Sequence, residues 1–269
     1  MYPYDILPGF TLYDLCLALG IFCAVLVFRF FSDRDKISAR LYNFILYDAL
    51  ITVVLGYALS VFTQALYNWR DEGKFVISAS TGATFLGGLV GGAAVFIAFY
   101  FGIGHFSFGN RENIKSFRWM TDVAAVCIPA AHSIGRIGCL TAGCCHGIVY
   151  ETAKWYTFRF LILNAADECI GVFYALPVQL YEALFLAVLA LALGIMKRKN
   201  KTNLLPIYMI AYGVWRFLIE YIRGDERGTT IVDFLSPSQL TSVLMVAGGI
   251  LLLVVMIKKS PKNNEETEK

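Results

Sequence analysis

Long uncharged apolar runs alternate with short polar segments along the whole chain. A helix needs about 20 apolar residues to cross a hydrocarbon core that is roughly 30 Å thick. Seven runs meet this requirement, at residues 10–31, 42–66, 80–104, 121–142, 177–196, 204–221 and 239–257. The pattern therefore predicts an all-α integral membrane protein with seven transmembrane helices.

The composition fits a protein whose solvent is the bilayer. Hydrophobic residues make up 58% and charged residues 16% of the 269-residue chain, whereas soluble domains contain about 45–50% apolar and about 25% charged residues. An ordinary soluble domain is therefore excluded. The first apolar run is too long for a signal peptide and no basic residue precedes it, so we expect a retained helix. We expect one transmembrane domain over residues 1–257 and a polar cytoplasmic tail over 258–269.

Basic residues divide unevenly between the two sides of the predicted bundle. One side holds those of segments 29–40, 111–118, 197–201 and 258–269, and the other holds the fewer ones of 70–74, 154–159 and 223–227. Since basic residues in short loops stay in the cytoplasm, the N-terminus is predicted outside and the C-terminus inside. The net charge of +3 reflects this bias and gives no reason to expect a nucleic acid as a partner.

Ionisable residues inside the predicted spans are costly and usually mark a functional cavity. The fourth span carries His132 and Arg136, whose spacing of four places them on one helix face. The sixth span carries Arg216, Glu220 and Arg223 on one stripe. An ion pair between Arg216 and Glu220 alone is the plainer interpretation, but it leaves Arg136 and Arg223 without an anion.

The predicted orientation gathers further polar residues in the outer half of the membrane. Gln179 and Glu182 share a face at the start of the fifth span, and Tyr13 and Gln239 lie at the outer starts of the first and last spans. A cavity lined by several arginines there has the charge to bind a phospholipid head group.

Glycines in two spans permit either close helix packing or backbone contact with a ligand. Gly87 and Gly88 lie in the third span, and Gly135 and Gly138 flank Arg136 in the fourth. For the glycines taken alone, ordinary helix packing is the favoured explanation.

Residues 135–147 read Gly-Arg-Ile-Gly-Cys-Leu-Thr-Ala-Gly-Cys-Cys-His-Gly. They resemble the signature of the prolipoprotein diacylglyceryl transferases, which begins Gly-Arg-hydrophobic-Gly-Asn and ends in a glycine, here Gly147. Matches in family order are Tyr13, Phe-Leu-Gly-Gly-Leu at 85–89, Pro-Val-Gln-Leu-Tyr-Glu at 177–182, Arg-Phe-Leu-Ile-Glu-Tyr-Ile-Arg at 216–223, and Ser238 with Gln239. The resemblance covers nearly the whole chain, and its seven-span fold agrees with the topology predicted from charge.

The resemblance implies transfer of a diacylglyceryl group from phosphatidylglycerol to the lipobox cysteine thiol of a prolipoprotein signal peptide, in a bacterial cell membrane and without a cofactor. Arg136 and Arg216 would hold the lipid phosphate, Glu220 would orient Arg216, and Arg223 would lie at the cavity mouth. The other candidates for lipid contact are Tyr13, Gly87, Gly88, Gly135, Gly138, Cys139, Gly147, Gln179, Glu182 and Gln239. A paralogue with another acceptor, or a non-enzymatic lipid-binding or transport protein on the same scaffold, is the alternative.

Three positions depart from the family pattern. Leu86 replaces a histidine considered important for activity, Cys139 replaces an asparagine, and Cys144 replaces a glutamate. Because leucine cannot accept a proton from a thiol, His132 is the expected replacement base, with His146 second. A packed, hydrogen-bonded His132 and a solvated His146 are the plainer alternatives.

The cysteines cluster around the same segment. Cys139, Cys144 and Cys145 lie close to His146, and thiolates with imidazole can bind zinc. Adjacent cysteines are not the usual zinc-site spacing, so no metal is expected from the sequence. A disulfide or a transient acyl carrier is a further possibility for these thiols.

Overall fold

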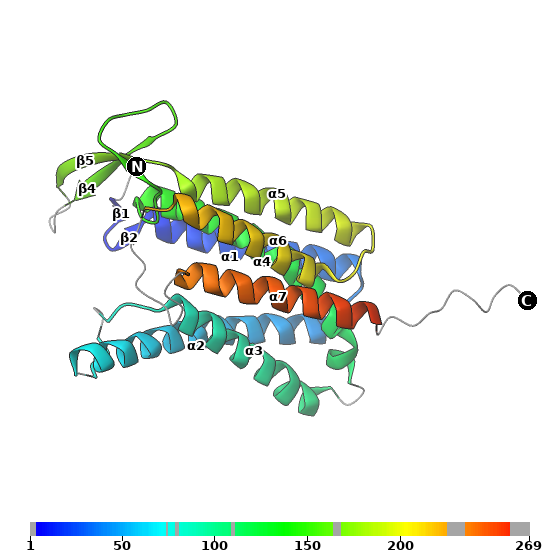
Figure 1. Cartoon of the computed structure of the whole chain (residues 1–269). Helices are drawn as coiled ribbons and strands as arrows, with labels where there is room; N and C mark the ends of the chain where they lie inside the picture. The colour runs from blue at the N-terminus through cyan, green and yellow to red at the C-terminus, as the bar shows by residue number, and fades with distance from the viewer. Residues whose placement is uncertain are drawn as a thin grey trace, which may run out of the picture. The chain divides into compact units, whose positions relative to one another are not determined.

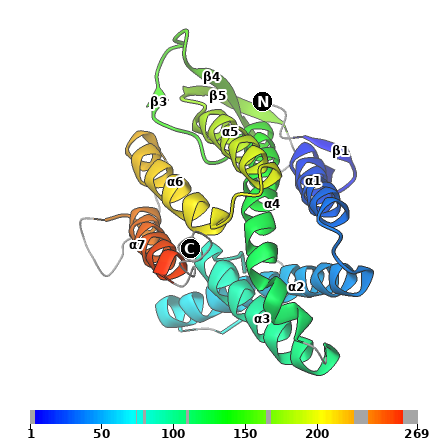
Figure 2. The same ribbon diagram turned by 90° about the vertical axis from the view of Figure 1, so that its right-hand side faces the viewer.

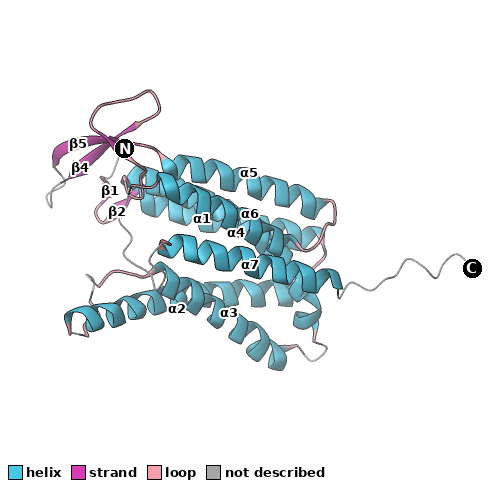
Figure 3. Cartoon of the chain, in the orientation of Figure 1, coloured by secondary structure: helices cyan, strands magenta, loops and turns pink. Residues whose placement is uncertain are grey.

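A computed structural model describes residues 4–73, 75–78, 81–108, 111–163, 168–224 and 235–258 (Figures 1 and 3). Within these ranges the chain forms the helices α1 (Leu12–Arg34), α2 (Ala39–Glu72), α3 (Phe85–Ser107), α4 (Glu112–Ala142), α5 (Val178–Arg198), α6 (Leu204–Ile219) and α7 (Pro237–Lys258). A short 3-10 turn, η1 (Glu220–Ile222), follows α6 directly. The basic residues Lys74 and Arg227 and most of the predicted tail lie outside the described residues.

The all-α membrane class predicted from the sequence is confirmed in outline. Six of the helices are long and apolar enough to cross a bilayer, and α6 has only 16 residues before η1 begins. Inside the six candidate spans, between 11% and 39% of the residues are buried within the protein. Apolar helices that turn most of their side chains outward require an apolar solvent, which a bilayer supplies.

Strands that the sequence pattern did not predict form two small antiparallel sheets (Figure 3). A hairpin of β1 (Asp5–Leu7) and β2 (Phe10–Thr11) precedes α1. Between α4 and α5, the strands β3 (Val149–Tyr150), β4 (Phe158–Leu163) and β5 (Cys169–Ala175) form a sheet of order β3-β5-β4. Phe160 and Phe173 are cross-strand partners with ring centroids 5.3 Å apart, so an aromatic pair of the kind that stabilises sheets fixes this register.

The chain divides into two compact units, Ser32–Phe117 and the remainder, Met1–Phe31 with Arg118–Lys269. In the first, α2 packs on α3 through small residues. A Cβ added to Gly88 would lie 3.1 Å from the Cβ of Ser60, and one added to Gly91 would lie 2.7 Å from Leu59. Gly87 faces Thr63 in the same way. The glycines of α3 therefore follow the ordinary packing explanation.

The second unit contains α1, α4, α5, α6 and α7 (Figure 2). Its core joins Phe31 of α1, Val123 of α4, Leu193 of α5 and Leu204 of α6. Glycines again allow close approach, because a Cβ on Gly20 would lie 2.9 Å from the Ala131 carbonyl oxygen.

A buried carboxylate helps to fix the start of α6. The Leu204 amide donates to Asp122 Oδ1 of α4 at 2.8 Å, which satisfies one of the free amides at the helix start.

Candidate active site

A buried carboxylate on α5 connects the functional side chains of α4 and α6. Glu182 is completely buried. Arg136 of α4 donates from a terminal guanidinium nitrogen to Glu182 Oε1 at 3.0 Å, and its Nε lies 3.0 Å from Oε2. Tyr212 of α6 donates its hydroxyl to the same Oε1 at 2.9 Å. Such two-point pairing fixes the plane of the guanidinium group.

A second charged group joins α6, η1 and the start of α7. Arg216 lies 2.8 Å from Glu220 Oε2 and donates to Ser238 Oγ at 2.7 Å. Ser236 donates its hydroxyl to Glu220 Oε1 at 2.8 Å, and Arg223 Nε lies 3.9 Å from Oε2. Glu220 therefore orients Arg216 one helical turn away, in the geometry that the sequence predicted.

The two groups pair three arginines with two carboxylates. Arg136 pairs with Glu182, and Arg216 and Arg223 pair with Glu220. The sequence interpretation that Arg136 and Arg223 have no anion is wrong, because Glu182 and Glu220 are their partners. Buried guanidinium groups are tolerated when carboxylates pair with them, and an arginine has five N–H donors, more than one carboxylate takes up.

His132 lies on the Arg136 face of α4, as its spacing predicted. Its ring meets the ring of Tyr212 edge-on, with centroids 5.4 Å apart. The imidazole is half-buried and within electrostatic range of Arg136, Glu182 and Arg216. His132 therefore lies near the charged centre and packs against Tyr212, and its role as a base stays a prediction.

The other predicted base lies elsewhere. The ring of His146 packs against Phe160 and Phe173 of the small sheet, and its Nδ1 lies 3.0 Å from the Gly147 carbonyl oxygen. His146 lies in the loop between α4 and β3 and is partly exposed, so the expected loop position is confirmed, although its ring packs on the sheet and is not fully solvated.

Close backbone approach explains two of the glycines proposed for lipid contact. Gly147 forms an isolated antiparallel bridge with Arg223, and a Cβ at Gly147 would lie 2.7 Å from the Ile222 carbonyl oxygen. Gly138 permits contact between α4 and α1, because its Cβ would lie 3.2 Å from the ring of Tyr13. Gly135 has more room, with Leu17 nearest at 3.9 Å.

Two of the glutamines predicted for lipid contact form hydrogen bonds with backbone groups. Gln179 is buried on α5 and donates to the carbonyl oxygen of Cys144, which ties α5 to the turn after α4. Gln239 accepts from the Ser236 amide at 3.1 Å, while the Gln239 amide donates to Ser236 Oγ at 3.2 Å. This reciprocal arrangement is a capping box at the start of α7. The spacing Ser-Pro-Ser-Gln at 236–239 carries that signal and could have revealed it.

Three thiols gather at the end of α4, with Cys139 in its last turn and Cys144 and Cys145 directly after it. The sulfur atoms of Cys139, Cys144 and Cys145 all lie within 4.8 Å of one another. Left-handed backbone at Gly143 (φ 78°) and at Cys145 (φ 61°) turns the chain back and brings them together. Hydrogen bonds from Cys139 and Cys144, together with the nearby Arg223, hold the pKa of the Cys145 thiol below its usual range. Hydrogen bonds with Cys139 and Cys145 raise the pKa of the Cys144 thiol.

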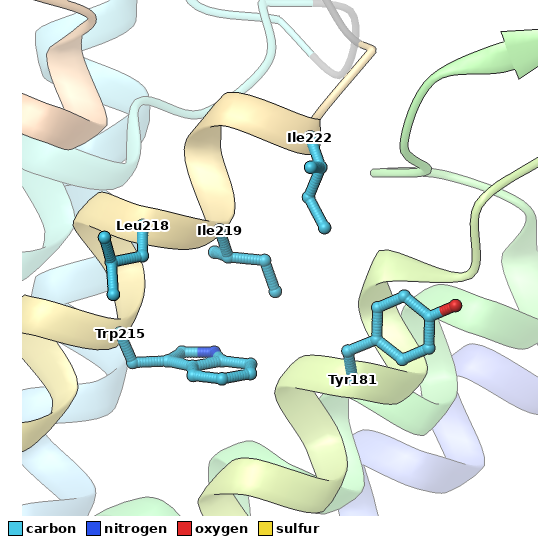
Figure 4. A pocket seen from close by; sticks show the side chains of 5 residues that line it. All are labelled: Tyr181, Trp215, Leu218, Ile219 and Ile222. Atoms are coloured by element: carbon cyan, nitrogen blue, oxygen red, sulfur yellow. The ribbon is translucent and has the colours of Figure 1, made fainter.

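An apolar groove of about 230 Å³ lies between α5, α6 and η1 (Figure 4). Figure 4 shows Trp215 projecting from α6 toward α5, where Tyr181 lies beside the groove. Leu218, Ile219 and Ile222 complete the lining. Trp215 and Tyr181 are direct chain neighbours of Arg216 and Glu182, so apolar groove and charged centre share the same two helices.

The fold and the site define a polytopic membrane protein with a buried polar centre of paired arginines and carboxylates. The family model of the prolipoprotein diacylglyceryl transferases matches residues 7–255, and the chain belongs to this family. It is 30% identical to phosphatidylglycerol--prolipoprotein diacylglyceryl transferase 2 of Clostridium perfringens, over 89% of this chain and 88% of the relative. It is 28% identical to the corresponding Clostridium tetani transferase (88% and 90% covered) and 27% identical to one of Dehalococcoides mccartyi (87% and 85%).

Proposed function

We propose that the chain is a membrane transferase that moves a diacylglyceryl group from phosphatidylglycerol to the lipobox cysteine thiol of a prolipoprotein, releasing glycerol phosphate. Family membership along nearly the whole chain supports this reaction. The observation that carries it is the buried centre in which Arg136 and Arg216, each held by a carboxylate, present oriented guanidinium donors of the kind that bind a phosphodiester.

In this proposal Arg136 and Arg216 bind the phosphate of the lipid. Glu182 and Tyr212 hold Arg136, and Glu220 and Ser238 hold Arg216, so the guanidinium planes are set before the lipid arrives. Fixed donors of this kind also stabilise the negative charge that gathers on the phosphate as the carbon–oxygen bond breaks. Glu182 is thus a positioning residue for Arg136.

The apolar groove suits an acyl chain of the lipid. Its volume of about 230 Å³ is below the roughly 300–1,000 Å³ of pockets that enclose drug-sized ligands. Hydrocarbon side chains dominate the lining, and Leu218 is exposed toward the surrounding lipid. A single chain lying along α5 and α6 would leave its head group at the arginines.

The remaining sequence candidates take supporting roles. Tyr13 packs against Gly138, within electrostatic range of Arg136 and the three thiols, and we assign Tyr13 and Cys139 to the wall of the lipid site. His132 is the proposed acceptor of the proton that leaves the attacking thiol. The shape of that site depends on Gly135, Gly138, Gly147, Gln179, Arg223 and Gln239. The glycines Gly87 and Gly88 of the other unit stay predictions for lipid contact.

We further propose seven spans in a bacterial cell membrane, with the N-terminus outside and the C-terminus cytoplasmic.

Replacement of a host transferase tests this function in cells. Expression in bacteria depleted of their own enzyme should restore growth and lipidated lipoproteins, and the Arg136→Ala variant should not. If the wild-type chain accumulates in the membrane without lipidating any lipoprotein, the non-enzymatic lipid-binding or transport alternative replaces the proposal.

A further inference from the structure

The proposed reaction alkylates a sulfur atom, and only the thiolate form of a cysteine is a good nucleophile. A free thiol with a pKa of about 8.5 is only about 3% ionised at pH 7. A thiol bound to zinc is ionised outright, because the cation stabilises its negative charge. A metal ion with one open coordination position would therefore serve this chemistry directly.

The three thiols after α4 form such a set of ligands. Their sulfur atoms lie within 4.8 Å of one another, and three thiolates around a tetrahedral zinc at about 2.3 Å would be roughly 3.8 Å apart. A side-chain movement of about 1 Å closes that difference. Cys139 and Cys144 have four residues between them, within the spacing of many zinc sites.

The cluster has an entrance and an open position. Cys144 is exposed, whereas Cys139 and Cys145 are partly buried. Among the described residues, no fourth cysteine, histidine or carboxylate joins the group. Three protein ligands with a vacant fourth position are typical of catalytic zinc, whereas structural zinc has four protein ligands.

The surroundings place this cluster at the proposed reaction centre. Arg223 lies within hydrogen-bonding reach of Cys145, and Tyr13 is within electrostatic range of all three thiols and Arg136. The carbonyl oxygen of Cys144 is held by Gln179, which precedes Glu182 by one helical turn. The thiol cluster is thus built into the same framework as the arginines.

We propose that Cys139, Cys144 and Cys145 bind a zinc ion whose fourth position takes the acceptor cysteine of the protein substrate. This role rests on the proposed function and explains how the thiolate that attacks the lipid forms. The acceptor loses its S–H proton to His132, and the thiolate binds the zinc. Its sulfur then forms a bond to the glyceryl carbon, while the carbon–oxygen bond to phosphate breaks and its electron pair leaves with glycerol phosphate. The neutral thioether binds zinc weakly and departs.

Cadmium titration of the purified, reduced and metal-free chain in detergent tests the site itself. We expect one ion per chain, with the sulfur-to-cadmium charge-transfer absorbance of three thiolates. Cys144→Ser should weaken binding at least about tenfold, since even outer ligand partners are worth 10–100-fold. Cys169→Ser, at another exposed cysteine, is the matched control and should bind as the wild type does. Equal affinity in the wild type and Cys144→Ser overturns the site.

A lipobox peptide tests the open position without any turnover. Adding the cysteine peptide to the cadmium-loaded chain should increase the absorbance by the contribution of a fourth thiolate. A peptide with serine in place of that cysteine should add nothing. An unchanged spectrum with both peptides overturns the proposed capture of the acceptor.

Transfer measurements separate this inference from the proposed function. Removing the metal should lower the rate about thirtyfold at pH 7, the inverse of the ionised fraction of a free thiol, and Zn²⁺ should restore it. Full transfer by the metal-free chain, or by Cys144→Ser, refutes the zinc role and leaves the transferase function intact. Capture of the peptide thiol without any transfer supports the site and refutes the function.

Discussion

The pairing of Arg136 with Glu182 gives a prediction that separates stability from catalysis. Glu182→Gln keeps an oxygen for the Tyr212 hydroxyl and removes the charge that neutralises Arg136. Removing one partner of a buried ion pair costs about 3–5 kcal/mol. At about 1.4 kcal/mol for each factor of ten, the ratio of folded to unfolded protein should fall roughly 150- to 5,000-fold.

Reversible unfolding in mixed micelles measures this change. Glu151→Gln removes a carboxylate from an exposed turn and serves as the control, with an expected effect within about 0.5 kcal/mol. The double variant Arg136→Met/Glu182→Leu should regain most of the stability, because neither member of the pair is left buried without its partner, yet it should have no transferase activity. If Glu182→Gln is no less stable than Glu151→Gln, the buried pair does not organise the centre.

Three further predictions concern the arginines, the proton acceptor and the topology. Arg136→Lys and Arg216→Lys should each lose nearly all transfer while remaining folded, because a point charge does not replace a planar fork; normal turnover in both would remove their phosphate role. His132→Ala should lower transfer at least about a hundredfold, whereas His105→Ala, at the exposed end of α3, should have little effect; equal rates would exclude His132 as the base. An N-terminal tag should be accessible from outside and a tag in the 199–203 loop only from the cytoplasm, and the reverse pattern would contradict the proposed orientation.

The apolar pattern could predict the helices because membrane helices must satisfy their own backbone. Each predicted run contains or overlaps one observed helix, and the deviations lie at the ends. The run at 42–66 becomes α2, which continues to Glu72, and the run at 204–221 becomes α6 followed by η1. The small sheet was not predicted because its strands are short. In addition, β3 pairs with β5, although β4 lies between them in the chain.

The site could be predicted one helix at a time, but its partners across helices could not. Spacings of four along one helix revealed Arg216 with Glu220 and His132 with Arg136. The contact of Arg136 with Glu182 joins residues 46 positions apart and depends on how α4 packs on α5.

The thiol cluster also could not be predicted from the sequence, although its residues are close together in the chain. Its three sulfur atoms converge where Gly143 and Cys145 both adopt a left-handed backbone conformation, which Cys145 does without being a glycine. That conformation is uncommon for residues other than glycine, so sequence alone gave no reason to expect it.

Transfer by the purified chain is the most direct test of the central claim. The protein in phosphatidylglycerol vesicles is given a lipobox peptide, and mass spectrometry follows the peptide while the released glycerol phosphate is quantified. We predict that the peptide gains one diacylglyceryl group on its cysteine for each glycerol phosphate released, and that Arg136→Ala abolishes both products. An unmodified peptide with the wild-type chain, under conditions in which the Clostridium perfringens relative is active, would contradict the account.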